Sequence, residues 1–203
     1  MSILTAVLSG VIGGSLFLFV FWKRLREDYS SSLIFSSGAY FIFMASIFSW
    51  LSQLLSRFAV ENSILEPAGL WFWGSILGFI VAFALSVKKL RLRWVETLEA
   101  AILGGAFWLL VVYGANLALS GFAVVALLLI LFYFLEKNYK RFSWYKSGRV
   151  GFSGLLAASV FFTIRAIASF VTTEFSTIGR IELVPSAVVA FLLLFSLYNL
   201  SEG

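Results

Sequence analysis

Apolar residues gather into seven long stretches along this chain, and short polar segments separate them. A helix needs about 20 predominantly apolar residues to cross the roughly 30 Å hydrocarbon core of a bilayer, and each stretch has about this length. We therefore predict an all-α polytopic membrane protein, with seven transmembrane helices in a single domain over residues 1–203. The expected helices cover approximately residues 3–22, 33–55, 69–87, 98–113, 119–135, 150–171 and 184–200.

The composition supports a membrane protein and excludes several kinds of chemistry. The chain is 61% hydrophobic and 12% charged, whereas soluble domains contain about 45–50% apolar and about 25% charged residues. It has no cysteine and no histidine. Disulfides, thiol nucleophiles, imidazole bases and histidine metal ligands are therefore excluded. No Gly-rich phosphate loop or catalytic carboxylate pair is evident, so we predict neither a metal nor a cofactor.

The basic residues predict an orientation. With the N-terminus outside, three short loops fall on the inner side and contain most of the 15 Lys and Arg residues. Cytoplasmic loops carry such an excess of positive charge. We therefore expect the C-terminus to be cytoplasmic, and we attribute the net charge of +5 to topology and not to nucleic-acid binding. The inner loops contain Lys23, Arg24, Arg26, Lys88, Lys89, Arg91, Arg93, Lys137, Lys140, Arg141, Lys146 and Arg149.

One cation lies inside an apolar stretch. Arg165 stands within residues 150–171, in the outer half of the membrane by this topology. An Arg near the centre of a spanning helix costs about 2.5–3.5 kcal/mol on insertion scales. It either snorkels to the outer headgroups or pairs with an acid for stability, or it faces a lipid phosphate or a carboxylate in an outer-leaflet cavity.

Other polar and small residues have simpler interpretations. Tyr113 and Asn116, three residues apart, share a face if their helix reaches that far, but an interfacial Tyr beside a hairpin turn is equally consistent. Gly74 and Gly78 form a GxxxG pattern, which is typical of close helix packing. Acidic residues near the start of a helix favour its dipole, which is the default interpretation of Glu96 and Glu99.

Three segments carry a resemblance to a known family. Gly69–Gly78 (GLWFWGSILG) fits the frame G-x-S-F-H-G-G-x-x-G at the start of a third helix. Val112–Leu117 (VYGANL) fits G-R-x-G-N-F at the end of a fourth, and Phe161–Ser169 (FFTIRAIAS) fits Y-G-x-x-R-F-x-x-E in a sixth. With the seven-helix layout, these segments resemble prolipoprotein diacylglyceryl transferase. That bacterial enzyme moves a diacylglyceryl group from phosphatidylglycerol to the cysteine of a prolipoprotein.

The resemblance covers the helices in outline, but several motif positions differ. Arg165 and Asn116 match a family Arg and a family Asn, and Glu99 is a candidate for an acid at the start of the fourth helix. Trp73 stands at the position of the motif His and Tyr113 at that of the motif Arg. The motif Glu positions are occupied by Gly121 and Ser169.

The resemblance therefore implies lipid binding with altered chemistry. It implies a phospholipid of the phosphatidylglycerol class in an outer-leaflet cavity of a bacterial-type plasma (inner) membrane, near Arg165, Asn116, Tyr113 and Trp73. A Trp cannot replace the imidazole, although Tyr113 offers a hydroxyl, or a ring face to Arg165. We expect transferase activity to be lost or changed, and we assign no catalytic residue. The expected partners are membrane phospholipid and either a prolipoprotein or another membrane protein. The alternative is a non-enzymatic accessory subunit or a small transporter on the same helix bundle.

Overall fold

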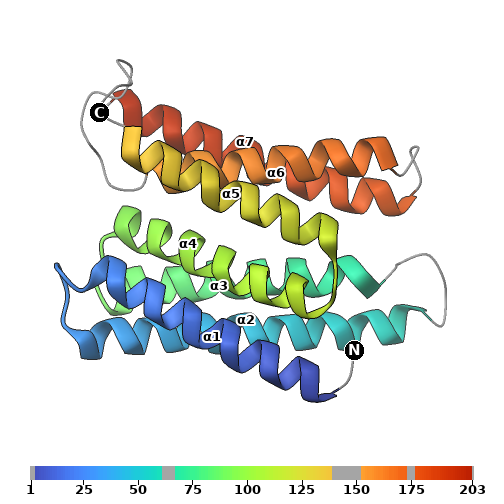
Figure 1. Cartoon of the computed structure of the whole chain (residues 1–203), viewed down its shortest axis with the longest axis horizontal. Coiled ribbons are helices and arrows are strands. Elements are labelled where there is room, and N and C mark those ends of the chain that lie inside the picture. The colour runs from blue at the N-terminus through green and yellow to red at the C-terminus, as the bar shows by residue number, and fades with distance from the viewer. Residues whose placement is uncertain (1–2, 61–66, 139–151, 173–176, 203) are drawn as a thin grey trace.

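The computed structural model describes residues 3–60, 67–138, 152–172 and 177–202, and all elements within these ranges are α-helices (Figure 1). The all-α prediction is therefore confirmed for the described chain. The helices are α1 Ile3–Leu25, α2 Ser31–Val60, α3 Pro67–Lys89, α4 Trp94–Ala115, α5 Leu119–Asn138, α6 Phe152–Thr172 and α7 Thr177–Glu202.

The helix ends differ most from the prediction at α7. We expected this helix to begin at about residue 184, next to Pro185, but it begins at Thr177 and contains Pro185 in its interior. A proline removes one backbone hydrogen bond, which usually ends a helix in water. Helices in membranes tolerate proline because neighbouring helices and local adjustments satisfy the freed backbone groups. α7 packs along α6, which provides such a neighbour.

Six of the described helices are long and apolar enough to cross a membrane. Their apolar windows are Val7–Leu25, Ser31–Leu55, Trp71–Lys89, Trp94–Ala115, Gly121–Asn138 and Ser153–Val171, and α7 contributes a shorter apolar segment, Leu183–Asn199. Large apolar side chains such as Phe43, Leu127 and Phe191 are more than half exposed. An apolar surface of this extent is suited to lipid and not to water. The predicted multi-pass helical membrane protein is thus supported by length, composition and surface.

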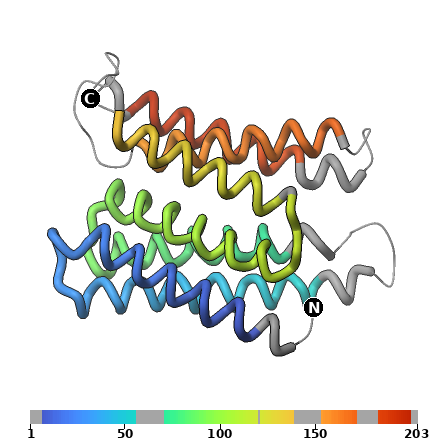
Figure 2. Tube along the Cα trace, viewed as in Figure 1, coloured from blue at the N-terminus to red at the C-terminus, as the bar shows by residue number. Residues whose placement is uncertain are grey.

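Consecutive helices run in opposite directions, and α4 links two groups of them (Figures 1 and 2). The most extensive contacts pair α1 with α4, α2 with α3, and α6 with α7. α4 also contacts α3, α5 and α6. Its buried residues are mainly small and include Ala100, Ala101, Gly104 and Ala106. Small side chains let several helices approach α4 at once, which explains its central place.

Aromatic side chains fill the space between α1, α2 and α3. Phe17 is fully buried, with its ring centroid 5.5 Å from that of Phe21, 5.8 Å from Phe41 and 5.6 Å from Phe79. Gly104 of α4 provides the opposite wall, since a Cβ there would lie 2.7 Å from Phe17 Cδ2. The pairing of a large ring with a glycine keeps α1 and α4 in close contact.

The GxxxG pattern of α3 lies directly against the backbone of α2. A Cβ at Gly74 would lie 2.5 Å from the carbonyl oxygen of Phe48. A Cβ at Gly78 would overlap the carbonyl oxygen of Met44 and lie 2.7 Å from Ala45 Cα. Glycine is therefore required at these two positions by the close approach of the backbones, in agreement with the packing interpretation.

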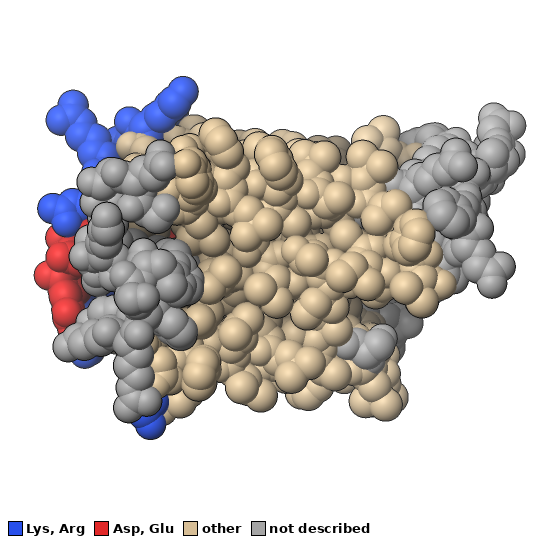
Figure 3. Space-filling model, turned by 90° about the horizontal axis from the view of Figure 1, so that it is seen from above, with Lys and Arg blue, Asp and Glu red and all other residues tan. Residues whose placement is uncertain are grey.

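Charged side chains gather at one end of the bundle, which we call the basic end (Figure 3). Three helices that run in the same direction end there with basic residues in their last turns: Lys23 and Arg24 in α1, Lys88 and Lys89 in α3, and Lys137 in α5. Because the helices alternate in direction, cations far apart in the sequence meet on one side. The three-dimensional arrangement of these five residues agrees with the clustering expected from the loops.

We expect Gly78→Leu to prevent normal packing of α2 on α3. Overpacking of a tight contact typically costs about 1–3 kcal/mol, and here the colliding atoms are backbone and cannot move aside. Thermal unfolding in detergent should show a lower midpoint and a smaller folded yield. Gly10→Ala is the matched control, because no heavy atom lies within 4 Å of a Cβ at that position. Equal stability of the two variants would contradict the proposed contact.

Candidate functional site

Arg165 stacks on an aromatic ring of a neighbouring helix. Its guanidinium carbon lies 4.0 Å from the ring centroid of Phe72 in α3. Arg165 is half-buried and stands seven residues before Thr172, the last residue of α6, or about 10 Å from this end at 1.5 Å per residue. Phe72 lies near the start of α3, and α3 reaches the basic end only at its last turn, so Phe72 is remote from that end. The contact therefore joins α3 and α6 in the half of the bundle away from the basic end.

Phe72 is the centre of what we call the aromatic cluster. Its ring centroid lies 6.4 Å from that of Phe161 and 6.2 Å from that of Phe162 in α6. Phe72 is 1% exposed, so its ring is enclosed by Arg165 and the neighbouring side chains. Phe161 and Phe162 precede Arg165 by four and three residues, which puts all three on one face of α6. The aromatic cluster consists of Trp71, Phe72, Trp73, Tyr113, Phe161 and Phe162.

The energy of the ring contact offsets only part of the cost of the buried cation. A cation–π contact is worth about 0.5–1 kcal/mol when exposed and about 2 kcal/mol or more when desolvated. Insertion of an Arg costs about 2.5–3.5 kcal/mol. Further interactions must supply the difference, and Arg165 does have interactions besides that with Phe72.

Two more of the predicted site residues belong to the aromatic cluster. The ring of Trp73 lies 5.4 Å from that of Phe72 and 6.1 Å from that of Phe162. Its indole nitrogen is buried without a hydrogen-bond partner among the described residues. The ring centroid of Tyr113 lies 6.1 Å from that of Trp71. The Tyr113 ring also contacts Gly121 of α5. Tyr113 therefore approaches the cluster from the side of Trp71, and the ring that stacks on Arg165 is Phe72 and not Tyr113.

Asn116 lies at the end of α4 and outside the aromatic cluster. It caps the C-terminus of α4, is exposed, and donates a hydrogen bond of 2.7 Å from Nδ2 to the carbonyl oxygen of Val112. The next residue, Leu117, has a φ of 54°, in the left-handed region. These features form the hairpin turn between α4 and α5. The amide of Asn116 thus binds its own helix and does not take part in the aromatic cluster.

Sequence reasoning missed the environment of Glu99. Glu99 is a residue of α4 that faces α6, and it is 7% exposed. It also takes part in a polar or ring interaction. Gly154 of α6 leaves room for it, since a Cβ there would lie 3.0 Å from Glu99 Cγ. The sequence pattern groups Glu99 with Glu96 as an acid that favours the helix dipole. Only Glu96 lies in the first turn of α4. The burial of Glu99 depends on the approach of α6, for which the sequence offers no separate signal.

A polar network joins the loops at the basic end. The Tyr29 hydroxyl donates to Glu96 Oε2 over 2.9 Å and accepts the backbone N–H of Arg93 over 3.0 Å. Arg93 also pairs with Glu96 over 3.1 Å, and this hydrogen bond raises the pKa of the Arg93 guanidinium. Partial burial is the main cause that raises the pKa of Tyr29 above its ordinary value. The network ties the segment before α2 to the start of α4.

A second ion pair holds α1 to α5 at the same end. Arg24 Nη1 lies 2.6 Å from Glu136 Oε1, and its guanidinium lies 5.1 Å from the centroid of the Phe132 ring. Both side chains of this pair remain partly exposed, so its contribution to stability is modest. The described residues contain no group of three or more His, Cys, Asp or Glu that would hold a metal ion.

No protein-family model, curated protein or solved structure matches this chain. The chemistry available at the aromatic cluster is that of one fixed cation surrounded by rings. A guanidinium of this kind is suited to an anionic group such as a carboxylate or phosphate, and the aromatic cluster provides no general base among the described residues.

We expect Tyr29→Phe to destabilise the folded protein by about 1–2 kcal/mol, because the carboxylate of Glu96 and the Arg93 N–H each lose a partner. Thermal unfolding in detergent measures this loss, with the exposed Tyr133→Phe as the matched control.

The pH dependence of the stability of wild type and of Tyr29→Phe provides a second measurement. The folded state raises the pKa of Tyr29, so its stabilising contribution is complete below the unfolded value of about 10. It is lost as the pH rises through the folded pKa. The stability difference between wild type and Tyr29→Phe should therefore be constant from neutral pH to about pH 9 and should shrink at more alkaline pH. A difference that vanishes near neutrality would show that Tyr29 does not act through these hydrogen bonds.

Proposed function

We propose that the protein binds a phospholipid of the phosphatidylglycerol class next to Arg165. The observation that supports this proposal is the stacking of the Arg165 guanidinium on Phe72. Stacking uses the face of the guanidinium plane, whereas the N–H donors point outward from its edge. A lipid phosphate approaching in this plane accepts two parallel, charge-assisted hydrogen bonds. The ring of Phe72 thus acts as a support that orients the donors.

The proposal includes a topology of seven spans with the N-terminus outside. The basic end then faces the cytoplasm, where loops rich in Lys and Arg belong. α7 is taken as the seventh span, because its 26 residues correspond to about 39 Å of helix. In this orientation Arg165 faces the outer leaflet of the bacterial-type plasma membrane. The outer end of α6 lies seven residues beyond Arg165, or about 10 Å at 1.5 Å per residue.

We further propose that the protein binds the lipid without the transfer chemistry of prolipoprotein diacylglyceryl transferase. In the resemblance stated above, Trp73 and Tyr113 stand where that family has a His and an Arg. Here both rings belong to the aromatic cluster. An indole has no basic nitrogen that accepts a thiol proton, and a phenol is not a permanent cation. The substitutions favour a site that retains lipid over one that activates a thiol.

We expect Arg165→Ala to reduce the amount of phosphatidylglycerol that remains bound after detergent purification. Loss of charge-assisted hydrogen bonds costs about 1.5–3 kcal/mol, which corresponds to about tenfold or more in affinity. Native mass spectrometry counts the bound lipid directly. Phe72→Leu should have a smaller effect of the same sign, because the cation remains but its support is removed.

Lys88→Ala provides the control for loss of one positive charge, since Lys88 is exposed at the basic end. It should retain the lipid bound to wild type. Unchanged lipid in Arg165→Ala, or an equal loss in both variants, would count against the assignment to Arg165.

We expect no diacylglyceryl transfer above background. Membranes containing this protein would be incubated with glycerol-labelled phosphatidylglycerol and a lipobox peptide, and the label on the peptide would be measured. Membranes without the protein give the background, and membranes with an authentic family enzyme show that the assay works. Transfer that depends on this protein would replace the proposal of lipid binding alone by that of a working transferase.

A further inference from the structure

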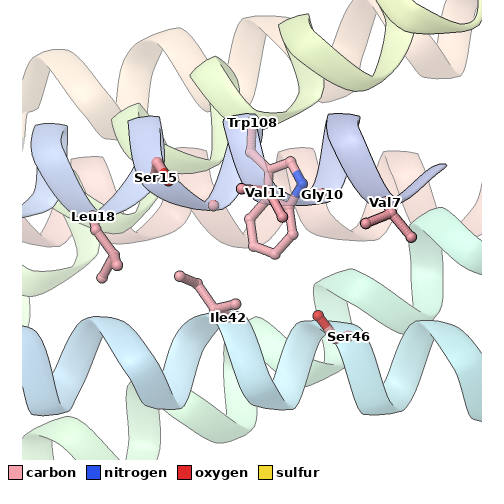
Figure 4. Close-up of a pocket in the computed structure, with 9 residues that line it drawn as sticks. Val7, Gly10, Val11, Ser15, Leu18, Ile42, Ser46 and Trp108 are labelled. Carbon is pink, nitrogen blue, oxygen red and sulfur yellow. The ribbon is translucent and has the colours of Figure 1, made fainter. Parts of the chain in front are cut away.

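A groove separates the first part of α1 from the middle of α2, and Trp108 of α4 forms its floor (Figure 4). Its volume is about 450 Å³. The α1 wall includes Val7, Gly10 and Gly14, and the α2 wall includes Ile42. No residue of the aromatic cluster lines it, so it is a separate feature from the surroundings of Arg165.

The groove exists because α1 is held by α4 more than by α2. The contacts of α1 with α4 are far more extensive than those with α2. Gly13 receives the Trp108 ring, since a Cβ there would lie 2.5 Å from Trp108 Cδ1. This contact brings α1 onto α4. At Gly10, by contrast, no atom of another residue lies within 4 Å of an added Cβ, so the space beside it is open. A large ring inserted beside a row of small residues thus leaves a gap that neither α1 nor α2 fills.

The groove opens sideways, onto the surface that lipid would cover. Val7 and Val11 in its α1 wall are 57% and 62% exposed. Ser15 and Ser46 on its two walls are also exposed. All the lining residues lie within the apolar windows of α1, α2 and α4. Since these windows are the membrane-crossing parts of the helices, the groove faces the hydrocarbon region and not water.

Size and chemistry decide between the possible occupants. An α-helix is about 10–12 Å across with its side chains and rises about 5.4 Å per turn, so this groove holds roughly one turn of a helix. One turn is too little to dock a partner helix or a second copy of α1. A single flexible hydrocarbon chain fits a space of this size, and the lining offers it apolar side chains with few polar groups.

We propose that one acyl chain of a bilayer phospholipid occupies this groove as a resident lipid, in contact with Trp108 and the Gly10–Gly14 segment of α1. The contact is with the hydrocarbon chain, so it does not require Arg165 or any particular headgroup. The groove would therefore hold lipid whether or not the site at Arg165 does.

The test uses a phosphatidylcholine with a photoactivatable diazirine in the middle of one acyl chain. The full-length protein would be reconstituted in phosphatidylcholine vesicles containing a trace of this probe, irradiated, and mapped by mass spectrometry. Crosslinks should be several-fold more abundant on the groove segments of α1 and α2 than on Leu127 and Ile130 of α5. Those two α5 residues are equally open to lipid, 59% and 63% exposed, and they line no part of the groove.

Gly10→Leu should reduce crosslinking of the groove several-fold, because its side chain enters the empty space without meeting another atom at Cβ. Ser46→Leu blocks the groove from the opposite wall and should have the same effect if Gly10→Leu fails to fold. Ala123→Leu on the exposed surface of α5 is the matched control and should change nothing. Arg165→Ala should also leave groove crosslinking unchanged, which separates this proposal from the site at Arg165.

Three results would overturn the proposal. Equal crosslinking of the groove and of α5 would show only ordinary lipid contact. Unchanged crosslinking in folded Gly10→Leu and Ser46→Leu would place the labelled chain elsewhere. Disulfide crosslinking of two chains through Val11→Cys, with no lipid label in the groove, would show that a second copy covers it.

Discussion

Close contact between helix backbones at glycines is the constraint on which this bundle depends. Lipid is as apolar as the helix surfaces, so hydrophobic burial does not drive the helices together, and tight van der Waals packing must do so. Gly74 and Gly78 bring α3 onto the backbone of α2, and Gly104 receives the ring of Phe17 from α1. The place of α3 determines where Phe72 lies, so the ring that meets Arg165 is positioned by the contacts of two glycines that follow it in the same helix, Gly74 and Gly78.

Arg165 shows how a cation is accommodated where acids are few. The ring of Phe72 stabilises the Arg165 guanidinium and leaves its positive charge in place. An oriented guanidinium plane suits recognition of an oxyanion. Arg24 at the basic end also lies over a ring, that of Phe132, and pairs with Glu136.

The sequence predicts the helices well because each must be apolar over a fixed length, and that length is visible without any knowledge of packing. It also singles out Arg165, since a charge inside an apolar stretch is conspicuous. It does not predict Phe72 as its partner, because several rings near the start of α3 were equally placed and the choice depends on how α3 meets α6. Pro185 and Glu99 were misjudged for the same reason: tolerance of an internal proline and burial of an acid both depend on a neighbouring helix.

α4 relates the two lipid sites proposed for this molecule. Trp108 extends from α4 into the groove beside α1 and α2, whereas Tyr113 contacts Trp71 in the aromatic cluster. Five residues turn a helix by about 500°, or 140° beyond one full turn, so these two side chains leave α4 on different faces. The small buried residues of α4, such as Ala100, Gly104 and Ala106, precede Trp108 and allow neighbouring helices to approach closely. α4 thus packs against both the groove and the aromatic cluster through different faces, so a substitution on one face leaves the contacts of the other in place.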